Sequence, residues 1–342
     1  MKGFLARKLF TVCALAVLLG ISSSVLGFEA QDKGDKAKDK QPQISEAESK
    51  ALAKIESAAD PNAKVQAASE FIKKYPKSTQ RANIIGHVVG EITKSQDAAQ
   101  KVTLLENLSG VFNQPADSAL ITPILLDAYI NAKRFDDFFR AGSAFIAKNP
   151  NDVPVLTQVA IVGVEQAKQK NTKFLEQSKE YGTKAIALIE AGTKPENLDD
   201  ARWASYQTKW LPQLYQALGI AALMTGNKAD AKAKVDKATS LNSSDPFNYF
   251  LLGMMLNEEY QQLAEQHKTL EAGPLKDTVL KQAQVKMDQV IELDARVVAL
   301  SEGRDGYQQL HDQILQELQS YYKYRHGSTD GLQQLIDKYK KQ

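Results

Sequence analysis

The feature that most constrains the fold of this chain is a short match that recurs at an offset of 34 residues. The match joins two triplets of identical residues, Tyr215, Leu218 and Gly219, and then Tyr249, Leu252 and Gly253. A period of this size is typical of repeat proteins in which each repeat is one pair of helices. One helix pair cannot cover its own apolar face, so consecutive pairs must stack. The match therefore predicts an all-α fold of stacked helix pairs.

The residues around the first triplet resemble a tetratricopeptide repeat (TPR). The first helix of such a repeat is similar to Tyr215-x-x-Leu218-Gly219-x-x-Ala222, and its turn to Gly226-Asn227. The second helix is similar to Ala231-x-x-x-Val235-x-x-Ala238, and the start of the next repeat to Asp245-Pro246. The resemblance implies a right-handed α-solenoid of stacked antiparallel helix pairs. We expect about five or six irregular repeats and C-terminal capping helices. The resemblance is clearest over residues 212–245 and 246–291.

Glycines within the helical pattern predict places where two helices approach closely. Gly219 and Gly253 leave room for the paired helix because they carry no Cβ. Gly86 and Gly90 also lie in a helical pattern, and the Lys-Ser or Lys-Thr of a phosphate-binding loop does not follow them. We therefore expect close helix contacts at these two positions, too.

Several segments depart from a regular repeat. Residues 198–210 lengthen one helix or add another. A later helix is expected to continue to about Leu270, to break at Gly273-Pro274 and to restart near Lys276. Two last helices, over about 307–325 and 330–340, are polar enough to cap the stack with an outer face in water.

The first 27 residues are predicted to be a signal peptide. Lys2, Arg7 and Lys8 precede an apolar stretch, and small residues precede a cleavage site after Gly27. This predicts export to the periplasm or cell envelope of a bacterium. The alternative is an uncleaved inner-membrane anchor, because 9–26 is near the minimum length that spans a bilayer. Residues 28–45 are expected to form a flexible charged linker, and 46–342 the helical repeat domain.

Composition argues against several classes of function. The 43 Lys and Arg residues are balanced by 41 Asp and Glu residues, which gives no electrostatic footprint for nucleic acid. Cys13 is the only cysteine and would be lost with the signal peptide, so no thiolate site would remain. The chain has four histidines, His87, His267, His311 and His326. Their positions in the sequence lack the spacing of a zinc site.

Paired carboxylates do not change this view, because adjacent residues of a helix do not face each other. We therefore expect no catalytic, cofactor or metal site and no small-molecule substrate. An envelope enzyme whose reactive groups come together from distant positions stays open as an alternative.

The first helix of each repeat is expected to line a concave groove that binds a segment of a partner protein. The exposed faces of the two clearest first helices supply eight candidate residues, Gln213, Gln216, Ile220, Leu223, Phe247, Phe250, Met254 and Asn257. Phe and Met are efficient contact residues in a groove. Alternatively, the extended helix or the C-terminal cap covers the second set of four. The sequence thus predicts a non-catalytic protein-binding scaffold, which contacts a membrane only if the N-terminal segment is retained.

Overall fold

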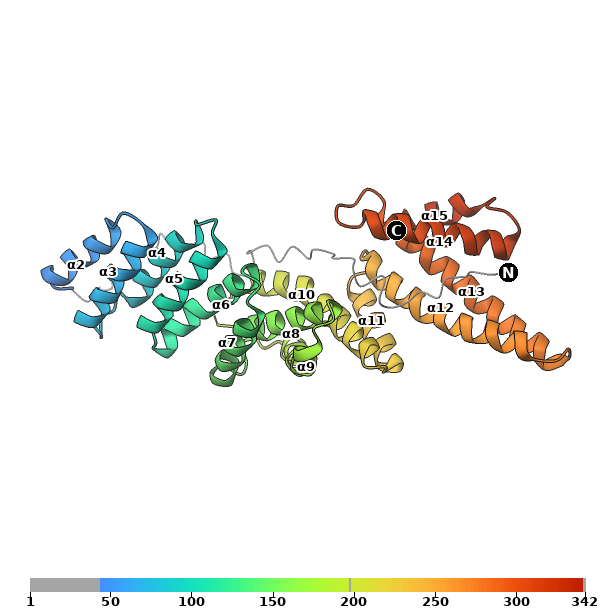
Figure 1. The fold of residues 1–342 in the computed structure, drawn as a ribbon, viewed down its shortest axis with the longest axis horizontal. Helices are drawn as coiled ribbons and strands as arrows, with labels where there is room; N and C mark the ends of the chain where they lie inside the picture. Colours follow the sequence, from blue (N-terminus) through green and yellow to red (C-terminus); the bar gives the residue numbers. More distant parts are fainter. Residues whose placement is uncertain (1–43, 197, 341–342) are drawn as a thin grey trace. The chain divides into compact units, whose positions relative to one another are not determined.

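The computed structural model describes residues 44–196 and 198–340, and in these residues every regular element is a helix. The predicted signal peptide and residues 28–43 of the predicted linker lie outside the described residues. The described chain divides into two compact units, residues 44–155 and 156–340 (Figure 1). The all-α prediction is confirmed.

The first unit consists of consecutive helices that pack on their neighbours in the sequence. Its helices are α2 (Glu46–Glu56), α3 (Pro61–Lys74), α4 (Arg81–Thr93), α5 (Ala98–Val111), α6 (Pro115–Asn131) and α7 (Phe135–Lys148). Ser45, Asp60 and Asp97 each accept a hydrogen bond from a backbone N–H in the first turn that follows them. These caps satisfy donors that a helix start would otherwise leave unpaired, and so they set where α2, α3 and α5 begin.

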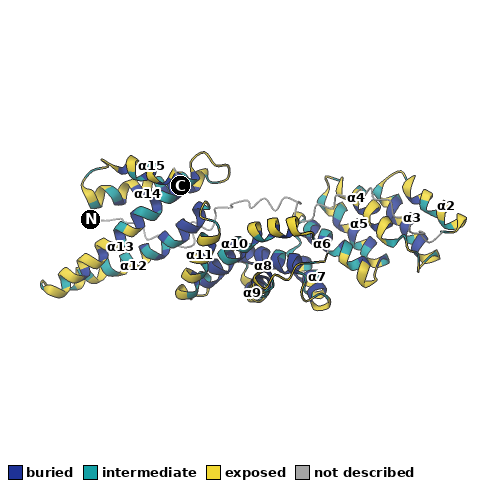
Figure 2. Ribbon diagram, turned by 180° about the vertical axis from the view of Figure 1, so that it is seen from behind, coloured by how far each residue is buried: buried dark blue, intermediate teal, exposed yellow. Residues whose placement is uncertain are grey.

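The second unit starts within α8 (Val153–Lys168) and continues to the C-terminal helix. Its other elements are η2 (Thr172–Phe174), α9 (Leu175–Glu190), α10 (Asp200–Met224), α11 (Lys228–Leu241), α12 (Pro246–Thr269), α13 (Pro274–Ser301), α14 (Gln308–His326) and α15 (Leu332–Lys340). Each helix from α9 to α13 packs on the next, and α15 packs on α13. The buried faces lie between these partners (Figure 2).

The predicted irregularities in the second unit are confirmed. Helix α10 has 25 residues because Asp199 caps it well before the repeat-like part begins. Helix α12 ends at Thr269, and α13 starts at Pro274. Proline fits the first turn of a helix, where its missing N–H would have no partner. Helix α14 ends at His326, before Gly327 with a φ of 86°, which is a left-handed conformation that suits glycine.

One predicted close helix contact is confirmed and two are wrong. A Cβ placed on Gly219 of α10 would lie 2.7 Å from Cγ2 of Val235 on α11. This spacing requires glycine, because real Cβ contacts are longer. A Cβ on Gly86 or on Gly90 would meet no atom within 4 Å. Both residues lie on the exposed side of α4, so the predicted helix is present but the predicted contact is not.

The described helices contain no segment that is both long and apolar enough to cross a membrane.

Candidate binding surface

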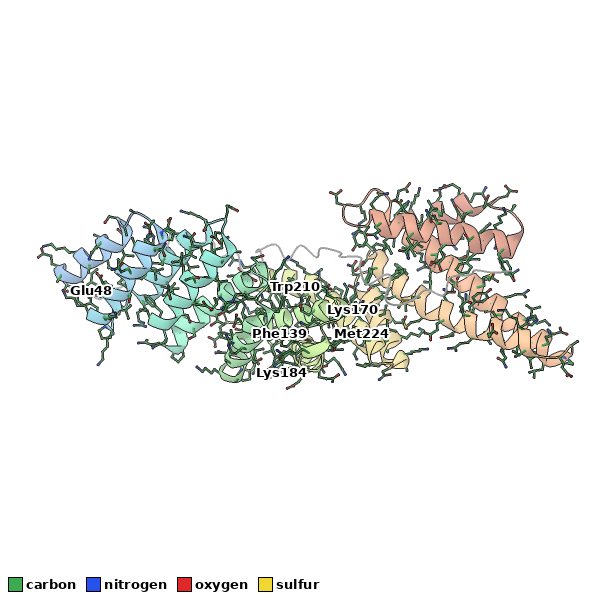
Figure 3. The ribbon with its side chains drawn as sticks, viewed as in Figure 1. Glu48, Phe139, Lys170, Lys184, Trp210 and Met224 are labelled. Carbon is green, nitrogen blue, oxygen red and sulfur yellow. The ribbon has the colours of Figure 1, made fainter. Side chains whose placement is uncertain are left out.

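The two helices expected to line the groove start at aspartate caps. The side chain of Asp199 accepts a hydrogen bond from the backbone N–H of Arg202 at 2.8 Å, and Asp245 accepts one from Phe247 at 2.9 Å. Asp245-Pro246 was predicted to open a repeat, and in the structure it stands at the start of α12. Trp210 and Met224, both on α10, are labelled in Figure 3 and show the direction of this helix.

The eight candidate groove residues separate into two groups of four. Those that are half-exposed are Gln213, Gln216, Leu223 and Met254. Those that are buried are Ile220, Phe247, Phe250 and Asn257. Three of the half-exposed residues come from α10, so a partner that approaches this structure reaches α10 more than α12. That a partner binds here stays a prediction.

The buried residues of α12 are covered by different neighbours. The Nζ atom of Lys168 on α8 lies 5.6 Å from the centre of the Phe247 ring, and the rings of Phe247 and Phe250 pack at 5.5 Å. Asn257 accepts a buried hydrogen bond of 2.8 Å from the hydroxyl of Tyr321 on α14. The C-terminal helices therefore do cover one end of the second set.

A polar network connects α10 to the start of α12. The Nε2 atom of Gln216 donates hydrogen bonds of 2.8 Å to Oδ2 of Asp245 and to Oδ1 of Asn248. Asn248 is 1% exposed, so its amide group is committed to this network. The hydroxyl of Tyr307 donates to Oδ1 of Asp245 at 3.3 Å. One aspartate thus caps α12 and binds groups from α10 and from the turn before α14.

Burial and the nearby charge of Asp245 raise the pKa of Tyr307 to about 12. The phenol therefore stays protonated at neutral pH and acts as a hydrogen-bond donor. The guanidinium of Arg304 lies 5.0 Å from the Tyr307 ring and donates to the carbonyl of Ser244 at 2.7 Å. These contacts hold the turn before α14 against the turn before α12, and their chemistry is structural.

The sequence did not predict that this region includes Asn248, Arg304 and Tyr307. Asp245 was found because Asp-Pro before an apolar run is a recognisable helix start. Tyr307 lies 62 residues from Asp245 in the chain, and a repeat pattern gives no signal for a contact across that distance. Gln216 was found, but as a groove residue and not as a member of this network.

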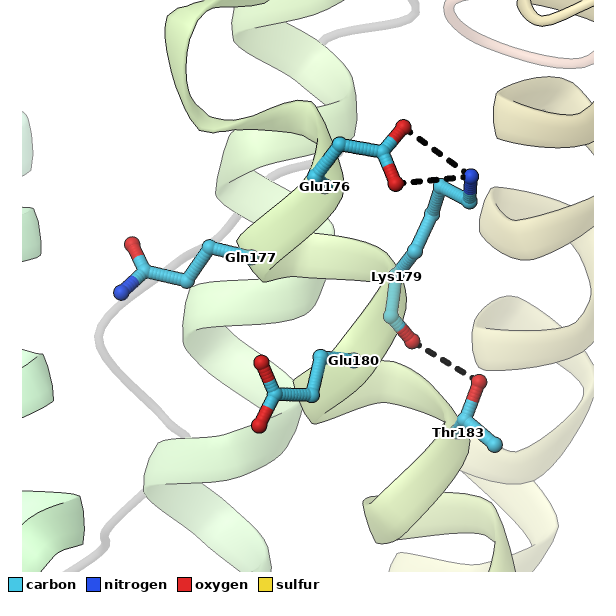
Figure 4. A pocket seen from close by; sticks show the side chains of 5 residues that line it. All are labelled: Glu176, Gln177, Lys179, Glu180 and Thr183. Atoms are coloured by element: carbon cyan, nitrogen blue, oxygen red, sulfur yellow. Dashed lines mark hydrogen bonds and ion pairs between the residues drawn. The ribbon is translucent and has the colours of Figure 1, made fainter.

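A shallow depression also lies on the surface of α9, and Figure 4 shows its lining. The five lining residues are Glu176, Gln177, Lys179, Glu180 and Thr183. Both carboxylate oxygens of Glu176 pair with Nζ of Lys179 at 3.0 Å, and Thr183 donates to the Lys179 carbonyl at 2.8 Å. All five come from consecutive turns of one helix, so the depression encloses nothing.

Among the described residues, no group of three or more His, Cys, Asp or Glu side chains is placed to hold a metal ion. His87 belongs to the first unit, and the other three histidines belong to the second. Nδ1 of His311 lies 3.2 Å from both Oγ of Ser301 and the carbonyl oxygen of Val298 on α13, so this ring serves to join two helices.

Compared with models of known protein families and with curated proteins, the chain matches none of them.

Proposed function

We propose that this chain is a non-catalytic scaffold of the bacterial cell envelope, a TPR-like solenoid that binds a segment of another protein. The observation that carries the proposal is the succession of two helix pairs, α10 with α11 and α12 with α13, whose first helices carry the same residues 34 positions apart. Such pairs present successive first helices on one side of a stack, where they can follow an extended or helical ligand.

The proposed contact surface is the half-exposed face of α10 together with Met254 of α12. Gln216 follows Gln213 by three positions, and Leu223 follows Gln216 by seven. This spacing places all three side chains on one face of the helix. An apolar side chain next to amide side chains suits a peptide, because the leucine contacts its side chains while the amide of Gln213 and the carbonyl oxygen of Gln216 bond to its backbone.

The test is an affinity pull-down with residues 28–342 as bait, which contain every described helix. The variant is Leu223→Asp/Met254→Asp, because both side chains are half-exposed and their replacement spares the core. The matched control is Leu241→Asp, which changes an exposed leucine of α11 that is 39% accessible. Circular dichroism checks that all three baits have the same helix content.

We expect a partner that is retained by the native bait and by the control and lost with the double variant. A partner that binds all three baits equally would reject this surface. Absence of any partner in an envelope extract would count against the scaffold function itself. Replacing Phe250 instead would be uninformative, because Phe250 is only 2% exposed and its loss would damage the core.

Location in the envelope is part of this proposal and rests on residues 1–27 of the sequence. The N-terminal residue of the protein purified from its own cells tests it. Phe28 would mean that the segment is cleaved, whereas Met1 would favour the membrane-anchored alternative.

A further inference from the structure

Helix α2, the first described helix, is held on its neighbours α3 and α4 by few side chains (Figure 1). Within α2 only Ile55 is buried. The hydroxyl of Ser78 donates a hydrogen bond of 2.5 Å to Glu48, and Lys54 pairs with Glu70 of α3 at 3.0 Å. A helix of 11 residues is too short to be stable alone in water, so each further contact matters for keeping α2 in place.

Lys64 of α3 supplies such a contact from inside the structure. Its side chain is buried, with 7% of the residue exposed. Its Nζ atom donates hydrogen bonds of 2.8 Å to the carbonyl of Glu56 and of 3.4 Å to the carbonyl of Ile55, both at the end of α2. The last carbonyls of a helix lack partners within it, and a positive charge is favourable there. Lys64 therefore fixes the end of α2 to α3.

The same ammonium group also meets a histidine of α4. The Nε2 atom of His87 lies 3.2 Å from Nζ of Lys64. An ammonium has three N–H donors and no lone pair, so this ring nitrogen must accept, and the neutral ring then carries its proton on Nδ1. Three donors thus meet three acceptors, two from α2 and one from α4. The arrangement is complete only while the ring of His87 is neutral.

Protonation of His87 is incompatible with this contact. An imidazolium ring carries a proton on both nitrogens, so it has no acceptor to offer to Lys64. Two positive charges would also stand 3.2 Å apart. His87 lies on the exposed side of α4, so the charged ring can turn into water instead. Imidazole is the side chain that ordinarily changes charge between about pH 5 and 8.

We propose that Lys64 and His87 form a pH-sensitive latch, which holds α2 on α3 and α4 at neutral pH and releases it at mildly acidic pH. When the imidazole takes up a proton, Lys64 loses one of its three acceptors, and its bonds to the end of α2 weaken. The closed latch binds the neutral ring, so the attachment of α2 is complete at higher pH and is lost as the pH falls through the titration of His87. The result is local opening of α2, while the helices beyond α4 stay folded.

Glu91 is the acidic group one turn from His87 on α4, and a carboxylate there favours the charged ring. It pairs with Lys94 at 2.9 Å. The hydrogen bond from Lys94 lowers the pKa of Glu91, and the charges of Lys94, Lys64 and protonated His87 add to the effect. Glu91 therefore stays ionised throughout the titration of the ring and acts as a constant charge.

The helices that pack against α3 and α4 add no other group that titrates in this range. Their acidic residues include Glu56 on α2, Glu106 on α5 and Asp117 on α6, and the last two are bound by arginines. Carboxylates ordinarily titrate at about pH 4 and lysines above about pH 10. His87 is the only histidine in residues 44–155. A response of α2 between about pH 7.5 and 5.5 therefore reports on this ring.

Amide hydrogen exchange of residues 28–342, followed by mass spectrometry, tests the latch. Protection is expressed relative to an unfolded peptide at the same pH, which removes the pH dependence of the exchange chemistry itself. In the native chain we expect the protection of α2 to fall about fivefold or more between about pH 7.5 and 5.5, because a charge-assisted hydrogen bond is lost. The protection of α10, in the second unit, should stay the same.

Two variants separate the charge of the ring from its size. His87→Gln keeps an amide oxygen that can accept from Lys64 and does not titrate, so protection of α2 should be equal at both pH values. His87→Lys carries a permanent charge, so protection should be low at both. The control is His326→Gln, which removes an exposed histidine of α14 and should respond as the native chain does. Circular dichroism checks that all the chains have the same helix content.

A second measurement reads the proton on the ring directly. The ¹⁵N chemical shifts of the histidines, with His87 assigned by its absence from the His87→Gln chain, are expected to place the proton on Nδ1 at about pH 7.5. Three results would overturn the proposal. They are equal protection of native α2 at both pH values, an unchanged pH response in His87→Gln, and a neutral ring with its proton on Nε2. None of these measurements involves a partner protein, so the latch and the scaffold function can fail independently.

Discussion

At the residue scale, Gly219 is the position where the fit between two helices is tightest. Replacement by leucine would push side-chain atoms against Val235, whose Cγ2 atom is already 2.7 Å from the site of a Cβ. We expect Gly219→Leu to lower the free energy of unfolding by about 1–3 kcal/mol through overpacking, measured by urea denaturation. Gly86→Ala is the control. It meets no neighbour within 4 Å and should raise stability by up to about 1 kcal/mol through helix propensity. Equal effects would refute the packing argument.

The buried ion pair between Arg81 and Asp117 is a second feature whose removal should lower the free energy of unfolding. Nε of Arg81 on α4 lies 3.1 Å from both carboxylate oxygens of Asp117 on α6, and the two side chains are 11% and 4% exposed. Arg81→Met leaves a buried carboxylate without its charged partner and with only the backbone N–H of Gln114 as a donor, so we expect a loss of about 3–5 kcal/mol in thermal or chemical unfolding. Adding Asp117→Asn should restore much of it.

The comparison for this ion pair is Arg140→Met. Arg140 also pairs with an aspartate, Asp137, but its side chain is 71% exposed. Exposed pairs contribute about 0–1 kcal/mol, so this variant should unfold almost as the native chain does. A loss as large as that of Arg81→Met would mean that burial does not decide the effect.

The phenol of Tyr307 makes stability depend on alkaline pH. Its pKa is about 12 in the folded chain, against an ordinary value of 10.0. Since the folded state holds the proton more tightly, stability is fully present below pH 10 and is lost as the pH rises towards 12. Tyr307→Phe should make this alkaline loss less steep, as followed by urea denaturation at a series of pH values. An unchanged slope would mean that the phenol is not held by Asp245.

At the element scale, helix ends were predictable because they depend on local chemistry. Asp245-Pro246, Gly226-Asn227 and Gly273-Pro274 each place a capping or helix-breaking residue at the boundary that the structure has. The exposure of Gly86 was not predictable, because a helical pattern shows that two residues share a face but not what that face meets. The same limit applies to Phe250, which lies on a helix whose neighbours come from distant parts of the chain.

Helix α15 illustrates an element held by contacts from outside itself. It has nine residues, which is too short to be stable alone in water. The guanidinium of Arg296 on α13 lies 4.6 Å from the ring of Tyr339 on α15 and 5.3 Å from that of Tyr249 on α12. We expect Arg296→Ala to speed amide hydrogen exchange in α15 by about tenfold while α10 is unaffected. Arg296→Lys should rescue it only in part, since an ammonium group does not stack as a plane.

At the scale of the whole molecule, the sequence predicted the fold class better than the surface. The 34-residue offset is the spacing at which helix-packing residues recur in the sequence, and in the structure it corresponds to neighbouring helix pairs. Which side chains are accessible depends instead on long-range contacts, such as that of Tyr321 with Asn257 across 64 positions. For this reason only four of the eight predicted groove residues are half-exposed, and the polar network around Asp245 was not foreseen.

The division into two units predicts that they unfold in separable steps. Contacts cluster within residues 44–155 and within 156–340, and repeat arrays owe their stability to neighbouring contacts. Both tryptophans, Trp203 and Trp210, belong to the second unit, so tryptophan fluorescence reports on that unit while circular dichroism reports on both. We expect Arg81→Met to shift the part of the circular dichroism transition in urea that belongs to the first unit and to leave the fluorescence midpoint unchanged. Gly219→Leu should shift the fluorescence midpoint. If each variant moved both signals together, the two units would unfold as one cooperative body, and the separate-unit description would be wrong.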